Sequence, residues 1–203
     1  MIQSQDRSYF IGASDTSYVV GNWTTKSFEK WWLEKLGLNK NNLSNEAIKA
    51  GNNYEHKILD SLNIDNLKKD NQIIINRLRV NLDGNTDKCI YEVKTHKQEK
   101  EFKVSKQYWR QAQVEMYASK IHKLFIVAYA LNENDYNNYF NDIDKSRLQL
   151  LPIEYDENFI NEYLIKLNIL TRCLERGEFP NDRNTVWSDK LGIRTRQKST
   201  IRN

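Results

Sequence analysis

The sequence predicts one α/β domain, a central mixed β-sheet flanked by helices, and three observations support this. Its 203 residues suffice to bury a hydrophobic core without metal ions or disulfide bonds. Amphipathic helical patterns and strand patterns both recur along the chain. The two cysteines, Cys89 and Cys173, are too few for a disulfide framework, although one bond between them stays open. We therefore expect a single domain over residues 1–180 in a reducing, cytoplasmic compartment.

Three helices are predicted before the first strand. Ser14 is a favourable N-cap for a short helix that Gly21 would end. Apolar residues at helical spacing predict a second helix over residues 25–36. A third helix begins near Ser44 and carries an apolar stripe along its length. Glu55 falls beside that stripe, which is an unusual place for a carboxylate.

The middle of the chain predicts a β-hairpin. Residues 75–82 alternate between apolar and polar side chains, and Asp83-Gly84 is a turn signal that ends this strand. The partner strand begins shortly after the turn, within residues 88–96. We therefore place the hairpin turn at Asp83 and Gly84.

The second half of the chain completes the sheet and its cover. The patterns predict a helix over residues 106–120, strands over 122–131 and 147–155, and a long helix over 156–177. Together with the hairpin, these strands give a sheet of at least four strands. Residues 181–203 are rich in Lys and Arg and poor in apolar residues, so we expect a basic, flexible C-terminal tail.

Composition limits the classes of partner. A net charge of +4 permits a nucleic-acid partner without demanding one. No stretch approaches the roughly 18 apolar residues typical of a membrane span, so we expect no membrane partner. The three histidines, His56, His96 and His122, lack the spacing of metal ligands. Aromatic spacing predicts a core position for Trp32 and leaves Trp109 open between the core and a DNA-stacking surface.

The predicted hairpin brings two carboxylates and an amine to one place. Asp83 ends one strand and Glu92 lies in its partner, so the two carboxylates are close neighbours. Glu92 and Lys94 are two residues apart and point to the same face, with Val93 pointing into the core. Each residue alone has an ordinary explanation: Asp83 can be a turn residue, and the other two can form a solvated strand face.

Taken together, these residues predict hydrolysis of a nucleic-acid backbone. Two converging carboxylates repel each other unless a cation neutralises them, and oxygen ligands with open positions suit Mg²⁺ or Mn²⁺ rather than zinc. A neighbouring lysine can orient or deprotonate a water that attacks a phosphodiester, while the ion stabilises charge on the phosphate.

The segment from Asp83 to Lys94 resembles the core motif of the PD-(D/E)XK nuclease superfamily, an aspartate followed after eight residues by Glu-x-Lys. Leu82 stands where that motif usually has a proline. The resemblance implies a restriction-endonuclease-like core. It also implies that Asp83, Glu92 and the backbone carbonyl of Val93 bind the metal ion, and that Lys94 is the catalytic lysine.

Three further blocks resemble the phage lambda exonuclease type of viral recombinase nucleases, the YqaJ-type family. These blocks are "IGASDTSYVVG" (11–21), similar to its Ile-Gly-Gly-Ser-Asp segment, "GNNYE" (51–55), similar to its Gly-x-x-x-Glu helix, and "YWRQAQVEMYAS" (108–119), similar to its Tyr-x-x-Gln-x-Gln-x-x-Met helix. All four blocks occur in the family's order over roughly residues 7–130. The resemblance implies that Glu55 supports a second metal ion and the attacking water, with Gln111 fixing that geometry.

The same resemblance implies a pocket for a terminal 5′-phosphate. Arg7 and Ser14 match positions that form this pocket in the family, and Lys100 can add positive charge to it. Tyr108 is a further candidate for contact with DNA, because an aromatic ring can stack on a base.

The family's activity implies a metal-dependent deoxyribonuclease of phage or prophage origin that acts in the cytoplasm of a bacterial host. Such an enzyme digests one strand of double-stranded DNA processively from 5′ to 3′ and leaves single strand for an annealing recombinase partner. The resemblance also implies a ring-shaped homotrimer. Two alternatives stay open: a restriction-like endonuclease, which would cut closed circles, and a catalytically silent nuclease-fold protein that binds DNA or acts as an inhibitor.

Overall fold

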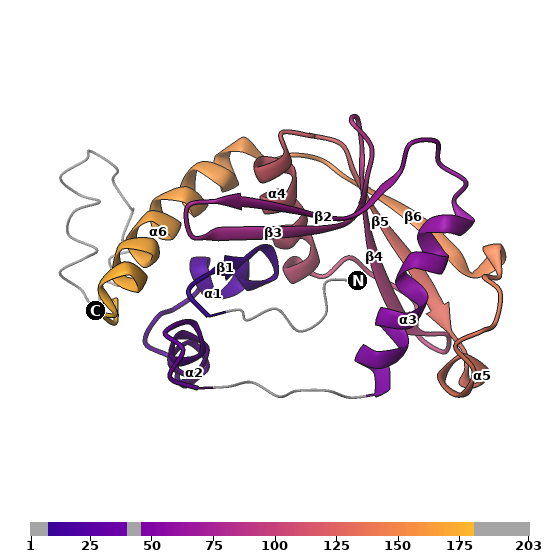
Figure 1. Cartoon of the computed structure of the whole chain (residues 1–203), viewed down its shortest axis with the longest axis horizontal. Helices are drawn as coiled ribbons and strands as arrows, with labels where there is room; N and C mark the ends of the chain where they lie inside the picture. The colour runs from indigo at the N-terminus through magenta and orange to yellow at the C-terminus, as the bar shows by residue number, and fades with distance from the viewer. Residues whose placement is uncertain (1–7, 40–45, 181–203) are drawn as a thin grey trace, which may run out of the picture.

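The computed structural model describes residues 8–39 and 46–180, which form one mixed sheet with helices on both faces (Figure 1). Its strands are β1 (Ile11–Gly12), β2 (Lys68–Ile75), β3 (Leu78–Asn85), β4 (Ile90–Lys97), β5 (Leu124–Leu131) and β6 (Leu148–Ile153). Its α-helices are α1 (Thr16–Val20), α2 (Lys26–Lys35), α3 (Glu46–Ser61), α4 (Lys106–Ser119), α5 (Glu133–Asn137) and α6 (Glu157–Arg176). Two short 3₁₀ helices, η1 (Ala13–Asp15) and η2 (Lys145–Arg147), complete the elements.

The centre of the sheet is a parallel pair, β4 and β5, connected through α4. Parallel neighbours need such a crossover, and a helix is its usual form. The pairing of β5 with β6 is antiparallel, and β2 and β3 form an antiparallel hairpin beside this core. The predicted strands over 122–131 and 147–155 are thereby confirmed.

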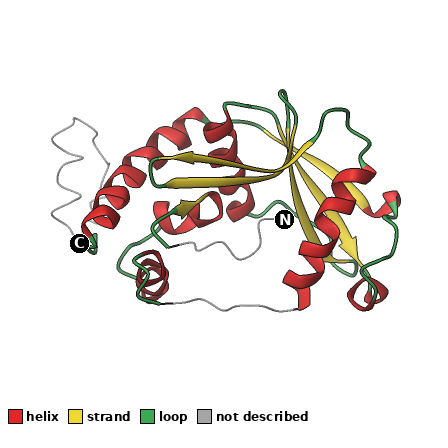
Figure 2. Cartoon of the chain, viewed as in Figure 1, coloured by secondary structure: helices red, strands yellow, loops and turns green. Residues whose placement is uncertain are grey.

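Strands β3 and β4 pair only at their ends, so they open into a fork (Figure 2). Gly84 pairs with Tyr91 of β4 on one edge and with Lys69 of β2 on the other. Leu78 at the far end of β3 likewise has β2 on one edge and β1 on the other. Strands β1 and β4 therefore share one edge of β3, and residues 80–83 between them pair with no described strand on that edge.

Two hydrophobic clusters hold the helices against the sheet. The larger one contains buried residues of α1, α2, α4 and α6, and Trp32 is fully buried in it, as predicted. The smaller one joins α3 to the other side of β4 and β5 through residues such as Tyr54, Val93 and Val127. Trp109 is partly buried at the edge of the larger cluster and packs edge-on against Phe159, with ring centroids 4.9 Å apart.

The hairpin prediction is wrong in two respects. Strand β3 continues through Asp83 and Gly84, and the turn to β4 lies at Thr86, whose hydroxyl accepts hydrogen bonds from the amides of residues 88 and 89. An earlier turn at Asn76, which has a φ of 53°, separates β2 from β3 inside the stretch predicted as one strand. The first error arises because the local turn signal at Asp83-Gly84 competes with strand pairing, and the pairing prevailed. The second arises because apolar alternation continues across the turn at Asn76 and hides it.

The first helix also differs from its prediction. Asp15, not Ser14, is the residue that precedes α1, and the Asp15 carboxylate accepts a hydrogen bond from the Gly12 amide at 2.8 Å. The other long helices match their predictions, including the caps of α6 at Asp156 and Gly177. The predicted start of α3 at Ser44 and the predicted basic tail lie outside the described residues. Among the described helices, none is long and apolar enough to cross a membrane.

Candidate active site

Three of the predicted catalytic residues meet in the fork between β3 and β4. The Val93 amide donates a hydrogen bond to Asp83 Oδ2 at 2.8 Å, so this carboxylate bridges the two strands where their regular pairing has stopped. Lys94 Nζ donates to Glu92 Oε1 at 2.6 Å. Because side chains alternate along a strand, Val93 lies in the cluster beneath α3 while Glu92 and Lys94 point to the opposite face.

Helix α4 adds an amide and a second buried carboxylate to this group. Gln111 Nε2 donates hydrogen bonds to Glu92 Oε1 at 2.6 Å and to Glu115 Oε1 at 2.7 Å. The Gln111 amide oxygen lies 3.4 Å from Lys94 Nζ. Sequence reasoning identified Gln111 but missed Glu115, although its position one helical turn after Gln111 was the available signal.

The second glutamine of the same helix has a structural role. Gln113 is fully buried, its amide nitrogen donates to the Glu154 carbonyl at 2.8 Å, and its amide oxygen accepts from the Asp156 amide at 2.7 Å. The two bonds tie α4 to the connection between β6 and α6. The two glutamines of this block, two residues apart, therefore face different parts of the molecule.

The fork concentrates negative charge away from water. Burial, reinforced by the charges of Glu92 and Glu55, raises the pKa of Asp83 well above its usual range. Burial and the charge of Glu92 do the same to the pKa of Glu115. Burial alone would lower the pKa of Lys94, but the surrounding carboxylates, Glu92 first, outweigh it and raise the pKa of Lys94. Lys94 is therefore protonated, while burial favours the protonated forms of Asp83 and Glu115.

The donor set at the fork fits a hard divalent cation. Glu92 is 3% exposed, and its Oε2 has no hydrogen-bond partner among the described residues. A buried carboxylate oxygen without a partner is costly, and a cation would remove that cost. Carboxylate and carbonyl oxygens without sulfur ligands suit Mg²⁺ or Mn²⁺.

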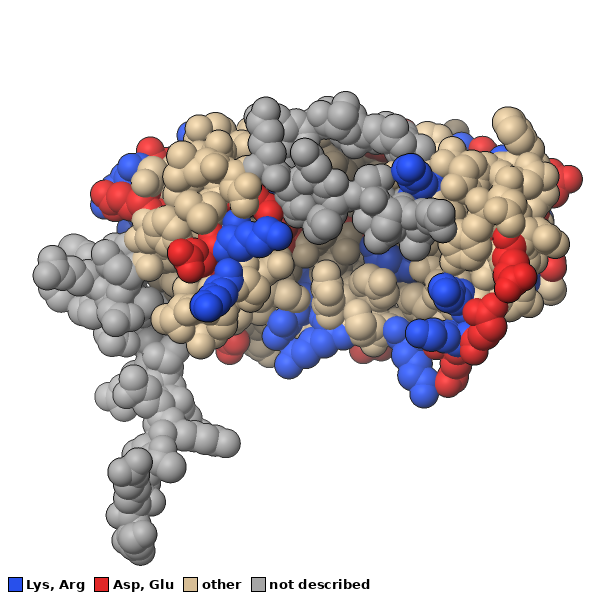
Figure 3. Space-filling model, turned by 90° about the horizontal axis from the view of Figure 1, so that it is seen from below, with Lys and Arg blue, Asp and Glu red and all other residues tan. Residues whose placement is uncertain are grey.

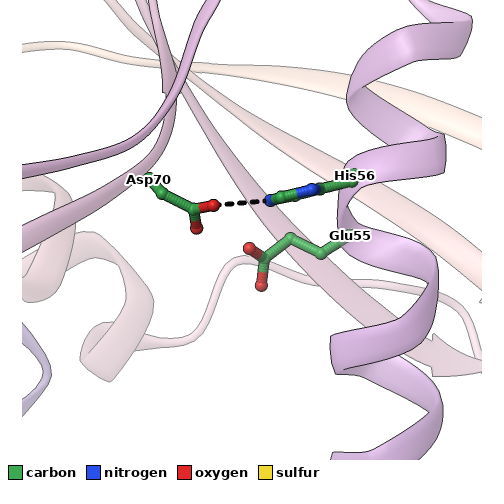
Figure 4. Close-up of side chains that lie close together, drawn as sticks. All are labelled: Glu55, His56 and Asp70. Atoms are coloured by element: carbon green, nitrogen blue, oxygen red, sulfur yellow. Dashed lines mark ion pairs between the residues drawn. The ribbon is translucent and has the colours of Figure 1, made fainter. Parts of the chain in front are cut away.

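On the α3 side, Glu55 lies among a second group of polar residues. The Glu55, His56 and Asp70 side chains place one ligand atom each within 4.8 Å of one another, and Figure 4 shows them converging from α3 and β2. His56 Nε2 lies 2.9 Å from Asp70 Oδ2. Burial, then the charges of Glu92 and Asp70, raise the pKa of Glu55 to about 7. Sequence spacing did not reveal His56 as a possible ligand, because Asp70 lies on a different element.

Two glycines let α3 approach the fork closely. A Cβ atom at Gly84, the residue after Asp83, would lie 2.8 Å from Leu59 Cδ2 of α3. A Cβ atom at Gly51 of α3 would lie 3.1 Å from Thr95 Oγ1 of β4. The close packing at these two points brings α3, and with it Glu55, up to the strands that carry Asp83 and Glu92.

The predicted phosphate and DNA contacts are only partly gathered at this site. The Tyr108 ring centroid lies 5.0 Å from Lys94 Nζ, so Tyr108 borders the site. Ser14 lies exposed on η1 and makes no hydrogen bond with a described residue, and Lys100 is exposed in the turn after β4. Neither contacts the carboxylates of the fork, and Arg7 lies outside the described residues.

Basic side chains are available on the molecular surface. In the face shown in Figure 3, Lys and Arg side chains spread across the middle, while Asp and Glu lie mostly toward the two ends. Such a distribution suits contacts to a phosphate backbone, which supply most of the sequence-independent affinity for DNA.

Comparison with known proteins identifies the fold. No family model and no curated protein matches the chain by sequence. Among solved structures, the alkaline exonuclease LHK-Exo of Laribacter hongkongensis matches with a TM-score of 0.65 and 17% identity over 92% of this chain and 95% of that chain. A structure of LHK-Exo in complex with dAMP matches equally well. A phage-related exonuclease from Haemophilus somnus 129PT matches with a TM-score of 0.63 and 14% identity over 89% of this chain and 96% of that chain. The predicted α/β fold is thus confirmed, and this chain has the fold of these exonucleases.

Proposed function

We propose that this protein is a metal-dependent deoxyribonuclease of the phage lambda exonuclease type, the YqaJ-type family, and that it digests linear double-stranded DNA from 5′ to 3′. The hydrogen-bonded group of Glu92, Lys94 and Gln111, with Asp83 across the fork and Glu55 beside it, carries this proposal. The fold match to exonucleases supports it independently of the sequence motifs.

Asp83, Glu92 and the Val93 carbonyl would hold the metal ion, and Glu55 would reach a second one. A bound Mg²⁺ or Mn²⁺ supplies stabilisation of charge on the phosphate and a lower pKa for the attacking water. Asp83 already has one oxygen fixed by the Val93 amide, which leaves its other oxygen to the ion. Ion binding requires the carboxylates to be ionised, so it must displace the protons that burial favours.

The protein's own groups divide the remaining work. Lys94 is held cationic at the fork, where it attracts a phosphate and stabilises the negative charge that develops during attack. Glu55, whose pKa lies at about 7, is suited to accept a proton from water near neutral pH. Gln111 contacts both Glu92 and Lys94 and holds their side chains in fixed relative positions. Tyr108 flanks Lys94, where its ring can contact the nucleotide.

The proposal is tested by digestion of end-labelled linear duplex DNA beside a covalently closed circle, with Mg²⁺ or EDTA. We expect loss of the linear DNA only, in the presence of metal only, and release of label first from the 5′ end. Lys94→Ala should abolish the loss. Lys97→Ala on the same strand is the matched control, because the Lys97 side chain is exposed and Lys97 meets Lys100 only through its backbone carbonyl, which the substitution keeps.

Two outcomes would favour the alternatives. Cutting of the closed circle would identify an endonuclease, since an exonuclease has no end to enter. Binding of DNA without loss of linear DNA in Mg²⁺ or Mn²⁺ would identify a catalytically silent DNA-binding or inhibitory protein.

We further propose, by analogy with the family, a homotrimer that encloses duplex DNA and delivers single strand to an annealing recombinase in the cytoplasm of a bacterial host. Residues 1–180 would form the single nuclease domain. Arg7, Ser14 and Lys100 would bind the terminal 5′-phosphate. Sedimentation of the 24.2 kDa chain would show the trimer as three times this mass. A monomer would refute the ring.

A further inference from the structure

Glu115 is a buried carboxylate for which none of the sequence motifs accounts. It lies on α4 with 0% exposure. Its Oε1 accepts a hydrogen bond from Gln111 Nε2 at 2.7 Å, and its Oε2 has no hydrogen-bond partner among the described residues. Burying a carboxylate is unfavourable unless its contacts compensate. The contact with Gln111 therefore indicates the role of Glu115.

The Gln111 amide is held in one orientation by charges on both of its sides. Its nitrogen carries two hydrogens, which point to Glu92 Oε1 at 2.6 Å and to Glu115 Oε1 at 2.7 Å. Its oxygen faces Lys94 Nζ at 3.4 Å. An amide turned by 180° would place its oxygen against two carboxylate oxygens and its hydrogens against an ammonium group. Glu115 and Glu92 together therefore exclude that orientation.

We propose that Glu115 is a positioning residue that locks the Gln111 amide and thereby holds Glu92 and Lys94 in the arrangement that binds the metal ion. Glu115 acts through Gln111, which hydrogen-bonds to Glu115, Glu92 and Lys94. Glu115 also lies directly beside the Glu92 carboxyl group. This inference rests on the proposed function, because it assigns Glu92 to the metal site. It extends that function by adding a residue outside the family motif.

Three variants separate positioning from general stability. Glu115→Ala removes the acceptor for one Gln111 hydrogen, whereas Glu115→Gln keeps an oxygen acceptor of the same size at the same place. Gln113→Leu is the matched control, since Gln113 is equally buried on the same helix but bonds to the Glu154 carbonyl and the Asp156 amide. Each variant is compared with wild type by thermal unfolding, so that a loss of stability is measured separately.

Two readouts follow the proposed role without measuring nuclease activity. The first is Mn²⁺ affinity, from the free-ion signal in electron paramagnetic resonance. Changes in partners of metal ligands typically cost about 10–100-fold in affinity. We therefore expect Glu115→Ala to lose Mn²⁺ affinity in that range, and Glu115→Gln and Gln113→Leu to keep an affinity close to that of wild type. The second is the pair of side-chain NH₂ resonances of Gln111 in the nuclear magnetic resonance spectrum. We expect these to be protected from exchange in wild type and Glu115→Gln, and to lose protection in Glu115→Ala.

Other results would overturn the inference. If Glu115→Ala and Gln113→Leu had the same Mn²⁺ affinity, or if the Gln111 resonances were unchanged in Glu115→Ala, Glu115 would have no positioning role. If Glu115→Gln lost Mn²⁺ as severely as Glu92→Gln with the Gln111 resonances intact, Glu115 would be a metal ligand instead. Failure of the proposed function looks different: wild type would show the expected Mn²⁺ and resonance pattern but degrade no DNA.

Discussion

The α4 side and the α3 side of the site are built differently. On the α4 side, Glu92, Lys94, Gln111 and Glu115 are linked by short hydrogen bonds in a buried network. On the α3 side, Glu55 is only partly buried and lies beside a half-exposed pair, His56 and Asp70. A buried, connected network resists rearrangement, whereas a partly solvated group can change its protonation and position. The α4 side is therefore preassembled, whereas the partly solvated α3 side can change its protonation and position when an ion binds.

The largest expected effect is the loss of activity in Glu92→Gln, which we compare with the smaller loss in Glu55→Gln. Glu92→Gln places an amide where two donors, Lys94 and Gln111, now converge on one carboxylate oxygen. We expect kcat on linear duplex DNA to fall by about 10²–10³-fold, with no recovery at high Mg²⁺. Glu55→Gln should lower kcat by about 10–100-fold, and kcat should recover partly as the Mg²⁺ concentration is raised. Rates over a series of Mg²⁺ concentrations measure both, and an identical Mg²⁺ response would remove the distinction between the two sides.

The two glycines that bring α3 to the fork should differ in their tolerance of a methyl group. Gly84→Ala forces a Cβ to within 2.8 Å of Leu59 Cδ2 in a packed region, so we expect a loss of about 1–3 kcal/mol in the free energy of unfolding. Gly51→Ala meets only Thr95 Oγ1 at 3.1 Å, and the higher helix propensity of alanine, up to ~1 kcal/mol, should offset that contact. Urea unfolding of both variants measures the difference. Equal losses would show that α3 is not closely seated at Gly84.

The α3 side should make metal binding depend on pH. The pKa of Glu55 is raised to about 7 from 4.5, so the folded protein holds a proton there that an ion must displace. Mn²⁺ affinity should therefore rise as the pH is raised through the range around 7, in which Glu55 loses its proton. The stability that protonated Glu55 contributes is fully present below pH 4.5 and is lost as the pH rises from there through about 7. Glu55→Gln should flatten the profile in this range; an unchanged profile would assign the proton to another carboxylate.

The smallest expected effect is that of Asp70→Asn. The charge of Asp70 is one of the causes that raise the pKa of Glu55, after burial and the charge of Glu92. Removing that charge should move the midpoint of the Mn²⁺-affinity profile slightly to lower pH, because partly solvated charges interact weakly. Asparagine tolerates the left-handed backbone at this position, where φ is 54°. A shift to higher pH would show that Asp70 does not act on Glu55 through its charge.

Sequence patterns predicted the helices and strands that carry the site well, but they predicted the arrangement of the site residues less well. Helices α2, α4 and α6 and strands β5 and β6 follow apolar spacing and cap residues closely. The pattern around Asp83 failed, because Asp-Gly is a local turn signal and pairing with β2 overrode it. Motif spacing named Asp83, Glu92, Lys94, Gln111 and Glu55, which the structure gathers around the fork. It did not name Glu115, which occupies an unspecified position of the 108–119 block, or Asp70, which belongs to no motif.

The sequence by itself determined the class of fold, the order of most elements and the residue types of a nuclease-like site, since these depend on local periodicity and on short motifs. The tertiary structure alone decided that β3 and β4 pair only at Gly84 and Asn85 and part at Asp83, that two glycines admit α3 to the opening and that Glu115 contacts Gln111. These features depend on strand register and on contacts between elements distant in sequence, and no local pattern encodes such contacts.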